Sequence, residues 1–177
     1  MAAIDETTKV PTHGHGTTSL TPEQMKAAVQ RFIDEALNKG DLSVVDDSYS
    51  KDLIDNDGGH PHLGTGWEEG RNEIMMYRTG FPDIHQTIHD MICEDDRVAH
   101  RWTTTGTHTG VFLGIKPTGK KVEIKGMTVS RFGPDGKIAE IWNFHDRMAF
   151  LEQLGTKGFL RAFWAKMRGK DKYVPAA

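Results

Sequence analysis

The stretch KVEIKGMTVSRFGPDGKIAEIWNF, residues 121–144, decides the fold. Residues 121–132 alternate apolar side chains with charged or polar ones, which is typical of a strand with one buried face. The segment GPDG that follows, residues 133–136, has Pro and Asp at its centre and ends in a glycine that tolerates a positive φ. Residues 137–144 then return as a second strand, so the stretch predicts an antiparallel hairpin.

Further elements are predicted on both sides of this hairpin. Residues 84–93 and 97–109 have strand composition and are separated by the turn Glu94–Asp96. Residues 110–119 predict a loop. After the hairpin, Asp146–Leu154 predicts a short closing helix, because its apolar residues recur at helical spacing.

The first half of the chain predicts helices. Thr21-Pro22-Glu23-Gln24 has the composition of a helix start, and an apolar stripe then continues to Gly40, a residue that commonly ends helices. Shorter helices are expected at 42–49 and 67–78, and a brief strand at 53–56. Helices followed by a long antiparallel sheet indicate an α+β fold, not alternating βαβ units.

Composition limits the class of protein. A chain of 177 residues with a formal charge of −3 and no basic stripe argues for one domain and against nucleic acid as the main partner. The one cysteine, Cys93, allows no internal disulfide, and no apolar run is long enough for a membrane span or a signal peptide. We therefore expect a cytoplasmic protein with no membrane partner. The expected boundaries are a flexible N-terminal tail at 1–20, the domain at 21–156 and a C-terminal extension at 157–177.

An ordered set of short motifs resembles the SnoaL-like polyketide (ester) cyclases of the nuclear transport factor 2-like superfamily. Each motif is weak alone, but together they cover roughly residues 22–155 in the order that the family has. The motifs are Gly80-Phe81-Pro82-Asp83, Glu94-Asp95-Asp96-Arg97-Val98-Ala99, Gly106-Thr107-His108-Thr109-Gly110, Gly114-Ile115-Lys116-Pro117-Thr118-Gly119-Lys120, Arg131-Phe132, Gly136-Lys137-Ile138-Ala139-Glu140-Ile141-Trp142-Asn143, Asp146 and Gln153-Leu154-Gly155.

The resemblance implies both a fold and a reaction. The fold is a cone, in which a strongly curved antiparallel sheet wraps around helices and leaves a pocket at the wide end. The reaction is an intramolecular aldol closure of a polyketide ester by acid–base catalysis, without metal or organic cofactor, on a hydrophobic small molecule. Such cones often pair sheet to sheet, so we expect a homodimer. The chain departs from many relatives at Asn56, where they carry a histidine.

Two residues are the candidates for catalysis. Asp146 follows the last strand, and strict alternation places it on the face of Trp142 and Phe144, where apolar neighbours would raise the pKa of its carboxyl group. Its alternative role is to cap the closing helix. His108 shares a face with Trp102 and could pass a proton or bind a carbonyl, although a structural histidine near a strand end fits the same pattern.

Five residues are the candidates for ligand binding: Asn56, Trp67, Trp102, Trp142 and His145. Flat apolar surfaces with a few polar groups suit an aromatic ligand, although tryptophan is also an ordinary core residue. Alternation turns His145 to the face opposite Asp146. Arg131 and Glu140 face each other across the predicted hairpin and are interpreted as a structural pair.

No metal site is predicted. His60-Pro61-His62 and the pair His85 and His89 are the only spacings to consider, beside His13-Gly14-His15-Gly16 in the N-terminal tail. In a strand, residues four apart lie roughly 13 Å apart, too far for one metal ion.

Two classes of function remain open from the sequence. One is an acid–base enzyme, with cyclisation first and an isomerase, dehydratase or hydrolase second. The other is a non-catalytic small-molecule-binding protein or a dimeric assembly protein on the same fold. An open pocket with a buried carboxyl group favours the enzyme, and a pocket filled by the protein's own side chains favours the assembly protein.

Overall fold

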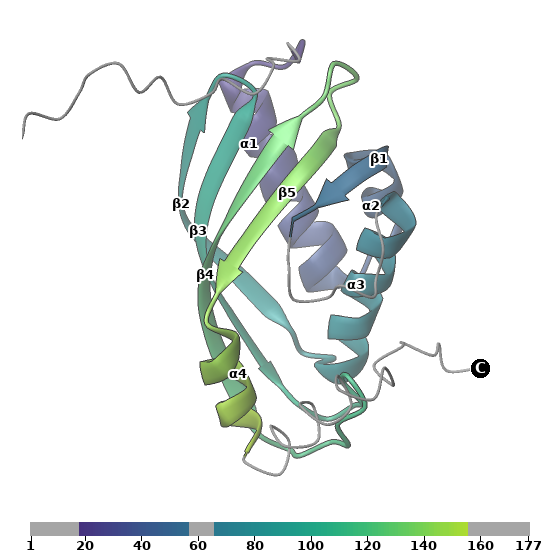
Figure 1. Cartoon of the computed structure of the whole chain (residues 1–177), viewed down its shortest axis with the longest axis vertical. Coiled ribbons are helices and arrows are strands. Elements are labelled where there is room, and N and C mark those ends of the chain that lie inside the picture. The colour runs from purple at the N-terminus through teal and green to yellow at the C-terminus, as the bar shows by residue number, and fades with distance from the viewer. Residues whose placement is uncertain (1–17, 57–65, 156–177) are drawn as a thin grey trace, which may run out of the picture.

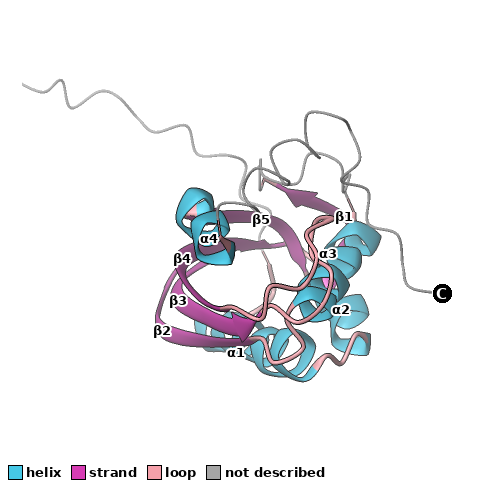
Figure 2. Ribbon diagram, turned by 90° about the horizontal axis from the view of Figure 1, so that it is seen from below, coloured by secondary structure: helices cyan, strands magenta, loops and turns pink. Residues whose placement is uncertain are grey.

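A curved sheet and a layer of helices on its concave side make up the molecule (Figures 1 and 2). The computed structural model describes residues 18–56 and 66–155. The order of elements within these ranges is helices, one strand, a helix, four strands and a closing helix. The predicted α+β class is confirmed.

The N-terminal helices begin and end where the sequence predicts. Helix α1 (Pro22–Arg31) starts at a capping box, in which the Thr21 side chain accepts from the Gln24 backbone N–H and the Gln24 side chain accepts from that of Thr21. It continues as the π-helical segment η1 (Phe32–Lys39) and ends at Gly40, whose φ is 82°. Helices α2 (Ser43–Ser48) and α3 (Trp67–Gly80) follow.

Five strands form one sheet in the order β1-β5-β4-β3-β2. They are β1 (Tyr49–Asp55), β2 (His85–Glu94), β3 (Arg97–Thr107), β4 (Lys121–Phe132) and β5 (Ile138–His145). Strands β2 to β5 are antiparallel neighbours, as predicted, and the β4–β5 turn closes with the Gly133 N–H donating to Lys137 O. Strand β1 differs from the expectation. It begins at Tyr49 instead of residue 53 and pairs in parallel with β5, so the sheet is mixed.

The concave face of the sheet carries the core. Along β3 every second residue is buried, beginning at Val98, and β4 shows the same alternation at Val122 and Ile124. Apolar side chains of α1 and η1, Met25 and Phe32 among them, pack against this face. In Figure 2 the sheet curls from β2 to β1 around the side on which α1, α2 and α3 lie.

The short helix α4 (Arg147–Leu154) closes one end of the curved sheet. Its Phe150 packs against Phe81 and Phe112, with ring centroids 5.8 and 5.5 Å away. Three predictions fall outside the described residues: most of the tail at 1–20, the extension at 157–177, and the His-rich loop that contains His60 and His62. No helix within 18–56 and 66–155 has the length and apolar character to cross a membrane.

Candidate active site

A cavity of about 130 Å³ lies between the concave face of the sheet and the helices. A cavity of this size has room for an aromatic group. Most of the wall surface is apolar. The residues that bring polar groups to it are Tyr49, Glu73, Tyr77, Gln86, His100, Trp102, Thr104, Thr105, Thr128, Ser130, Asn143 and His145.

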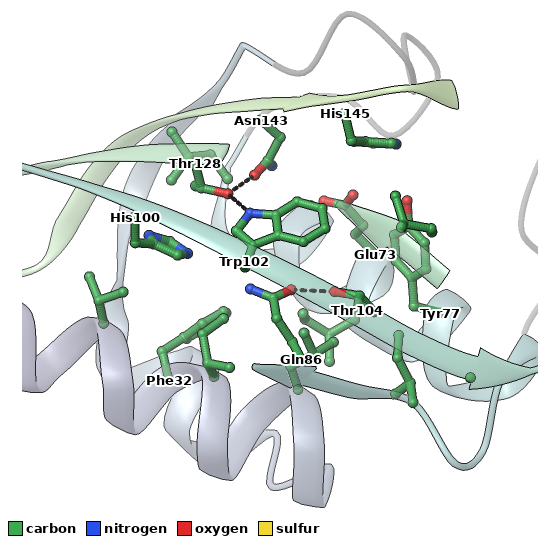
Figure 3. A pocket seen from close by; sticks show the side chains of 18 of the residues that line it. Phe32, Glu73, Tyr77, Gln86, His100, Trp102, Thr104, Thr128, Asn143 and His145 are labelled. Carbon is green, nitrogen blue, oxygen red and sulfur yellow. Dashed lines mark hydrogen bonds between the residues drawn. The ribbon is translucent and has the colours of Figure 1, made fainter. Parts of the chain in front are cut away.

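A chain of hydrogen bonds runs across the sheet wall of the cavity. The Trp102 indole N–H donates to Thr128 Oγ1 over 2.9 Å, and the Thr128 hydroxyl donates to Asn143 Oδ1 over 2.6 Å. Nearby, the Thr104 hydroxyl donates to Gln86 Oε1 over 2.9 Å. Figure 3 shows both sets of bonds. These polar side chains are held by one another, which fixes the indole of Trp102 in one orientation.

Gly126 gives the indole of Trp102 its place. The two residues are paired across β3 and β4, and Gly126 is paired with His145 across β4 and β5. A Cβ atom at Gly126 would lie 2.6 Å from Cη2 of the Trp102 ring and 2.7 Å from the Phe144 carbonyl oxygen. Only glycine at this position lets the ring lie flat on the strand.

A carboxyl group faces the cavity from α3. Glu73 is half-buried and hydrogen-bonds with the side chain of Asp55, the last residue of β1. Burial raises the pKa of Glu73 to about 8, and the negative charge and hydrogen bond of Asp55 add to the shift. Glu73 therefore exchanges a proton near neutral pH, which is the property that a proton shuttle needs.

Two tyrosines and a histidine lie near Glu73. Burial raises the pKa of the Tyr49 and Tyr77 phenols, so both stay neutral hydrogen-bonding groups. The His145 ring lies against Trp102, with ring centroids 6.1 Å apart. Burial lowers its pKa, against the opposing effect of Asp146, so the ring is neutral at pH 7. Figure 3 shows Glu73, Tyr77 and His145 at one end of the cavity.

Two of the predicted site residues, Trp102 and His145, line this cavity, and the first catalytic candidate does not. Asp146 is exposed at the N-terminus of α4, where Oδ1 accepts from the Ala149 N–H over 2.9 Å. The capping role predicted for Asp146 is confirmed. Its catalytic role stays a prediction, without a contact to the cavity to support it.

His108 is fully buried behind the cavity wall. It lies beyond the end of β3, where Nδ1 accepts from the Thr118 N–H over 3.3 Å and is 3.0 Å from Thr118 Oγ1. Its ring also packs on Phe81, with centroids 5.1 Å apart. The contacts of Nδ1 fit the structural role predicted for His108, while its buried Nε2 has no hydrogen-bond partner within residues 18–56 and 66–155. His108 shares the inward face of Trp102, as alternation predicts, but it does not line the cavity.

The other predicted ligand-binding residues also lie outside the cavity lining. Asn56 is exposed and donates to Glu140 Oε1 and to the Ile141 carbonyl oxygen. Trp67 begins α3 and is partly buried against the core. Trp142 lies on the outer face of β5, because the inward positions of that strand are Ile141, Asn143 and His145. The structural pair of Arg131 and Glu140 is confirmed, with Nε 2.9 Å from Oε2.

Among the residues that sequence reasoning missed are Glu73 and His100 of the cavity wall, and Asp55, which hydrogen-bonds with Glu73 but does not itself line the cavity. The sequence contains a signal for His100, because alternation along β3 places it on the same face as Trp102. Glu73 precedes Ile74 and lies one helical turn before Tyr77, and both of these residues line the cavity. Glu73 was not predicted to face inward, because charged side chains on a helix usually face solvent. Only the parallel pairing of β1 brings Asp55 to it.

The described residues offer no ready metal site. Within 18–56 and 66–155, no three His, Cys, Asp or Glu side chains gather as metal ligands would. His85 and His89 lie on a strand, as predicted, and both are exposed. Tyr, Asn and Thr dominate the remaining polar wall, and these groups bind ligands by hydrogen bonds.

The comparisons with known proteins agree with the fold. No curated protein matches the sequence at a significant level. Among solved structures, IdmH of Streptomyces antibioticus, to which a polyketide cyclase activity is ascribed, is 28% identical, with a TM-score of 0.64 over 75% of this chain and 99% of its own. AclR of Streptomyces galilaeus, to which a hydroxylase activity is ascribed, is 29% identical, with a TM-score of 0.66 over 76% and 98%.

TsrD of Streptomyces laurentii is 24% identical over 77% of this chain and 98% of its own, with a TM-score of 0.69, and supports the fold alone. The family model of the SnoaL-like polyketide cyclases matches residues 27–154. That range contains the cavity lining and all five strands, and the resemblance predicted from the motifs is confirmed. The chain belongs to the SnoaL-like polyketide cyclase family.

Proposed function

We propose that this protein is a cofactor-independent acid–base enzyme that closes a ring in a hydrophobic aromatic ester by an intramolecular aldol reaction. One observation carries the proposal. Glu73 places a carboxyl group with a pKa of about 8 on the wall of an apolar cavity. Family membership supports the class of reaction, and the cavity supports the class of substrate.

In the proposed reaction, Glu73 acts as the proton shuttle. The ionised carboxylate takes a proton from the carbon between the aromatic ring and the ester carbonyl, and the electron pair becomes an enolate conjugated with both. The enolate carbon then forms a bond to a ketone carbon of the same molecule, and the ketone oxygen takes the electron pair. Glu73 returns its proton to that oxygen, so the product is an isomer of the substrate with one new hydroxyl group.

The surrounding groups suit this chemistry. Burial, helped by the charge of Asp55, raises the pKa of Glu73 to about 8. The neutral rings of His145 and Tyr77 offer hydrogen bonds at the same end of the cavity. Such groups stabilise negative charge on an oxygen most strongly where water is excluded. The cavity is open rather than filled by side chains, which argues against the alternative of a pure assembly protein.

The test uses a small substrate of the required type, a methyl phenylacetate with an acetoacetyl chain in the ortho position. Its ring closure gives a six-membered ring and is followed by chromatography. We expect Glu73→Gln to lower the enzymatic rate by about 10²- to 10⁴-fold, the range of general acid–base catalysis. Glu68→Gln, an exposed glutamate on the same helix, is the matched control and retains the wild-type rate.

The pH dependence gives a second readout of the same proposal. Because the ionised form of Glu73 starts the reaction, the wild-type rate rises with pH through about 8 and levels off above it. A Glu73→Gln variant that keeps wild-type turnover would contradict the assignment. Binding of the substrate without any turnover by the wild type would favour the alternative, a non-catalytic small-molecule-binding protein.

The expected homodimer is part of the proposal. Its support is an apolar patch on the outer face of the sheet, where Met127 and Phe144 are cross-strand partners and are 45% and 61% exposed. Light scattering tests it. Phe144→Lys is expected to give a monomer, and Val111→Lys, an equally apolar position on a loop, leaves the dimer intact. A cytoplasmic location also stays a prediction.

A further inference from the structure

His100 is a polar side chain at the opposite end of the cavity from Glu73. It lies on β3, it is 3% exposed, and it lines the cavity. Neither ring nitrogen has a hydrogen-bond partner within the described part of the chain. The neighbouring polar side chains differ, because Trp102, Thr128 and Thr104 all have partners.

An unpartnered buried imidazole is unfavourable for folding. Leaving a buried donor or acceptor unsatisfied costs about as much as several ordinary hydrogen bonds gain, so such groups are normally paired. Burial alone lowers the pKa of His100 to about 4, and no charged group contributes to the shift. The ring is therefore neutral at pH 7 and offers one N–H donor and one nitrogen acceptor.

His100 lies apart from Glu73, the residue proposed to transfer the proton. In the view of Figure 3, the indole of Trp102 lies between His100 and Glu73, and Phe32 of η1 lies on the His100 side. The cavity thus has a polar group at each end and an aromatic wall between them. A ligand that satisfies both ends has an aromatic body with polar groups on opposite sides.

We propose that His100 binds a hydroxyl group of the aromatic substrate, on the side of the ring away from the reacting ester. A hydroxyl is favoured over a carbonyl because it pairs with either nitrogen of a neutral imidazole, as acceptor from one or donor to the other, whichever tautomer is present. The proposal deepens the proposed function and rests on it for the premise that the cavity holds a small aromatic molecule. It makes the substrate a phenol.

The test compares two probes of nearly equal shape, 2-naphthol and 2-methylnaphthalene, by equilibrium dialysis. The quantity of interest is the ratio of their affinities, because it cancels any general change in the cavity. We expect His100→Phe to reduce the preference for 2-naphthol over 2-methylnaphthalene by about five- to tenfold, which is the worth of one net hydrogen bond. The variant should still bind 2-methylnaphthalene. His89→Phe, an exposed histidine on β2, retains the wild-type ratio.

Glu73→Gln separates this proposal from the catalytic one. If the hydroxyl binds at His100, the ratio in Glu73→Gln stays within about twofold of wild type, whatever happens to turnover. A ratio that falls in Glu73→Gln and not in His100→Phe would place the hydroxyl at the other end and overturn the proposal. An unchanged ratio in both variants would overturn it too, because a bound water molecule would then satisfy His100.

A measurement on the wild type covers the case in which His100→Phe does not fold. The ring nitrogens of His100 are followed by nitrogen-15 NMR as each probe is added. We expect 2-naphthol to shift one ring nitrogen and 2-methylnaphthalene to leave both unchanged. Equal effects of the two probes, or failure of the wild type to bind either, would contradict the proposal.

Discussion

Two carboxyl groups in this protein, Glu73 and Asp146, have opposite environments. Glu73 lies against apolar side chains and the charge of Asp55, which keeps its proton to about pH 8. Asp146 lies in solvent at the N-terminus of α4, where its carboxylate accepts from the Ala149 N–H. The difference in environment, and not the type of residue, makes Glu73 the better candidate for proton transfer.

A pair of substitutions at Asp146 separates its two predicted roles. Asn is as good an N-cap as Asp but carries no proton to transfer, whereas Ala provides neither function. We expect Asp146→Asn to retain both stability and turnover, and Asp146→Ala to lose about 1 kcal/mol of unfolding free energy with turnover retained. Urea unfolding and the ring-closure assay measure the two properties. Lost turnover in a stable Asp146→Asn variant would restore Asp146 as a catalytic residue.

Strand β5 shows how far sequence alternation leads and where it stops. Alternation correctly divides the strand into one set with Trp142 and Phe144 and another with Asn143 and His145. It does not say which set faces the interior. Two large aromatic residues suggested the first set, but the structure turns the second set inward and leaves Phe144 61% exposed. Because the outer face of β5 is also rich in apolar residues, as a dimer surface would be, hydrophobicity alone does not predict which set of residues faces the interior.

The strand pair β3 and β4 yields a prediction at Gly126. Because an added methyl group there would meet the Trp102 ring, Gly126→Ala must displace the indole and break its bond to Thr128. We expect a loss of about 1–3 kcal/mol in unfolding free energy, the usual cost of overpacking, and weaker binding of 2-methylnaphthalene. Chemical denaturation and dialysis measure these effects. Gly114→Ala is the control for ligand binding only: an added Cβ meets nothing within 4 Å, but the φ of 73° makes the substitution strained.

At the scale of the whole molecule, Glu73 links stability to pH. Its pKa is raised from 4.5 to about 8 on folding, so its contribution to stability is complete below pH 4.5 and is lost as the pH rises through 8. Wild-type Tm is therefore expected to fall by at least about 3 °C more than that of Glu73→Gln between pH 6.5 and 8.5. Glu68→Gln should follow the wild type. Parallel Tm curves for all three proteins would show that the pKa of Glu73 is not raised.

The sequence predicts those parts of the molecule that depend on neighbouring residues and misses those that depend on distant ones. The helix boundaries, the β4–β5 hairpin and the strands β2 to β5 depend on local patterns, and each lies close to its predicted position. The pairing of β1 with β5 and the contact of Asp55 with Glu73 depend on residues far apart in the chain. No local pattern encodes such contacts, so the carboxyl pair emerges only from the three-dimensional arrangement.

The parallel pairing of β1 also has a consequence for the synthesis of the protein. Tyr49 pairs with Ile138, so more than three quarters of the 177 residues must leave the ribosome before β1 can find its partner. Until then its edge is unpaired, a state in which strands are prone to join neighbouring chains. Strand β5 also supplies Asn143 and His145 to the cavity wall, so a chain that has not been translated through β5 cannot complete the site.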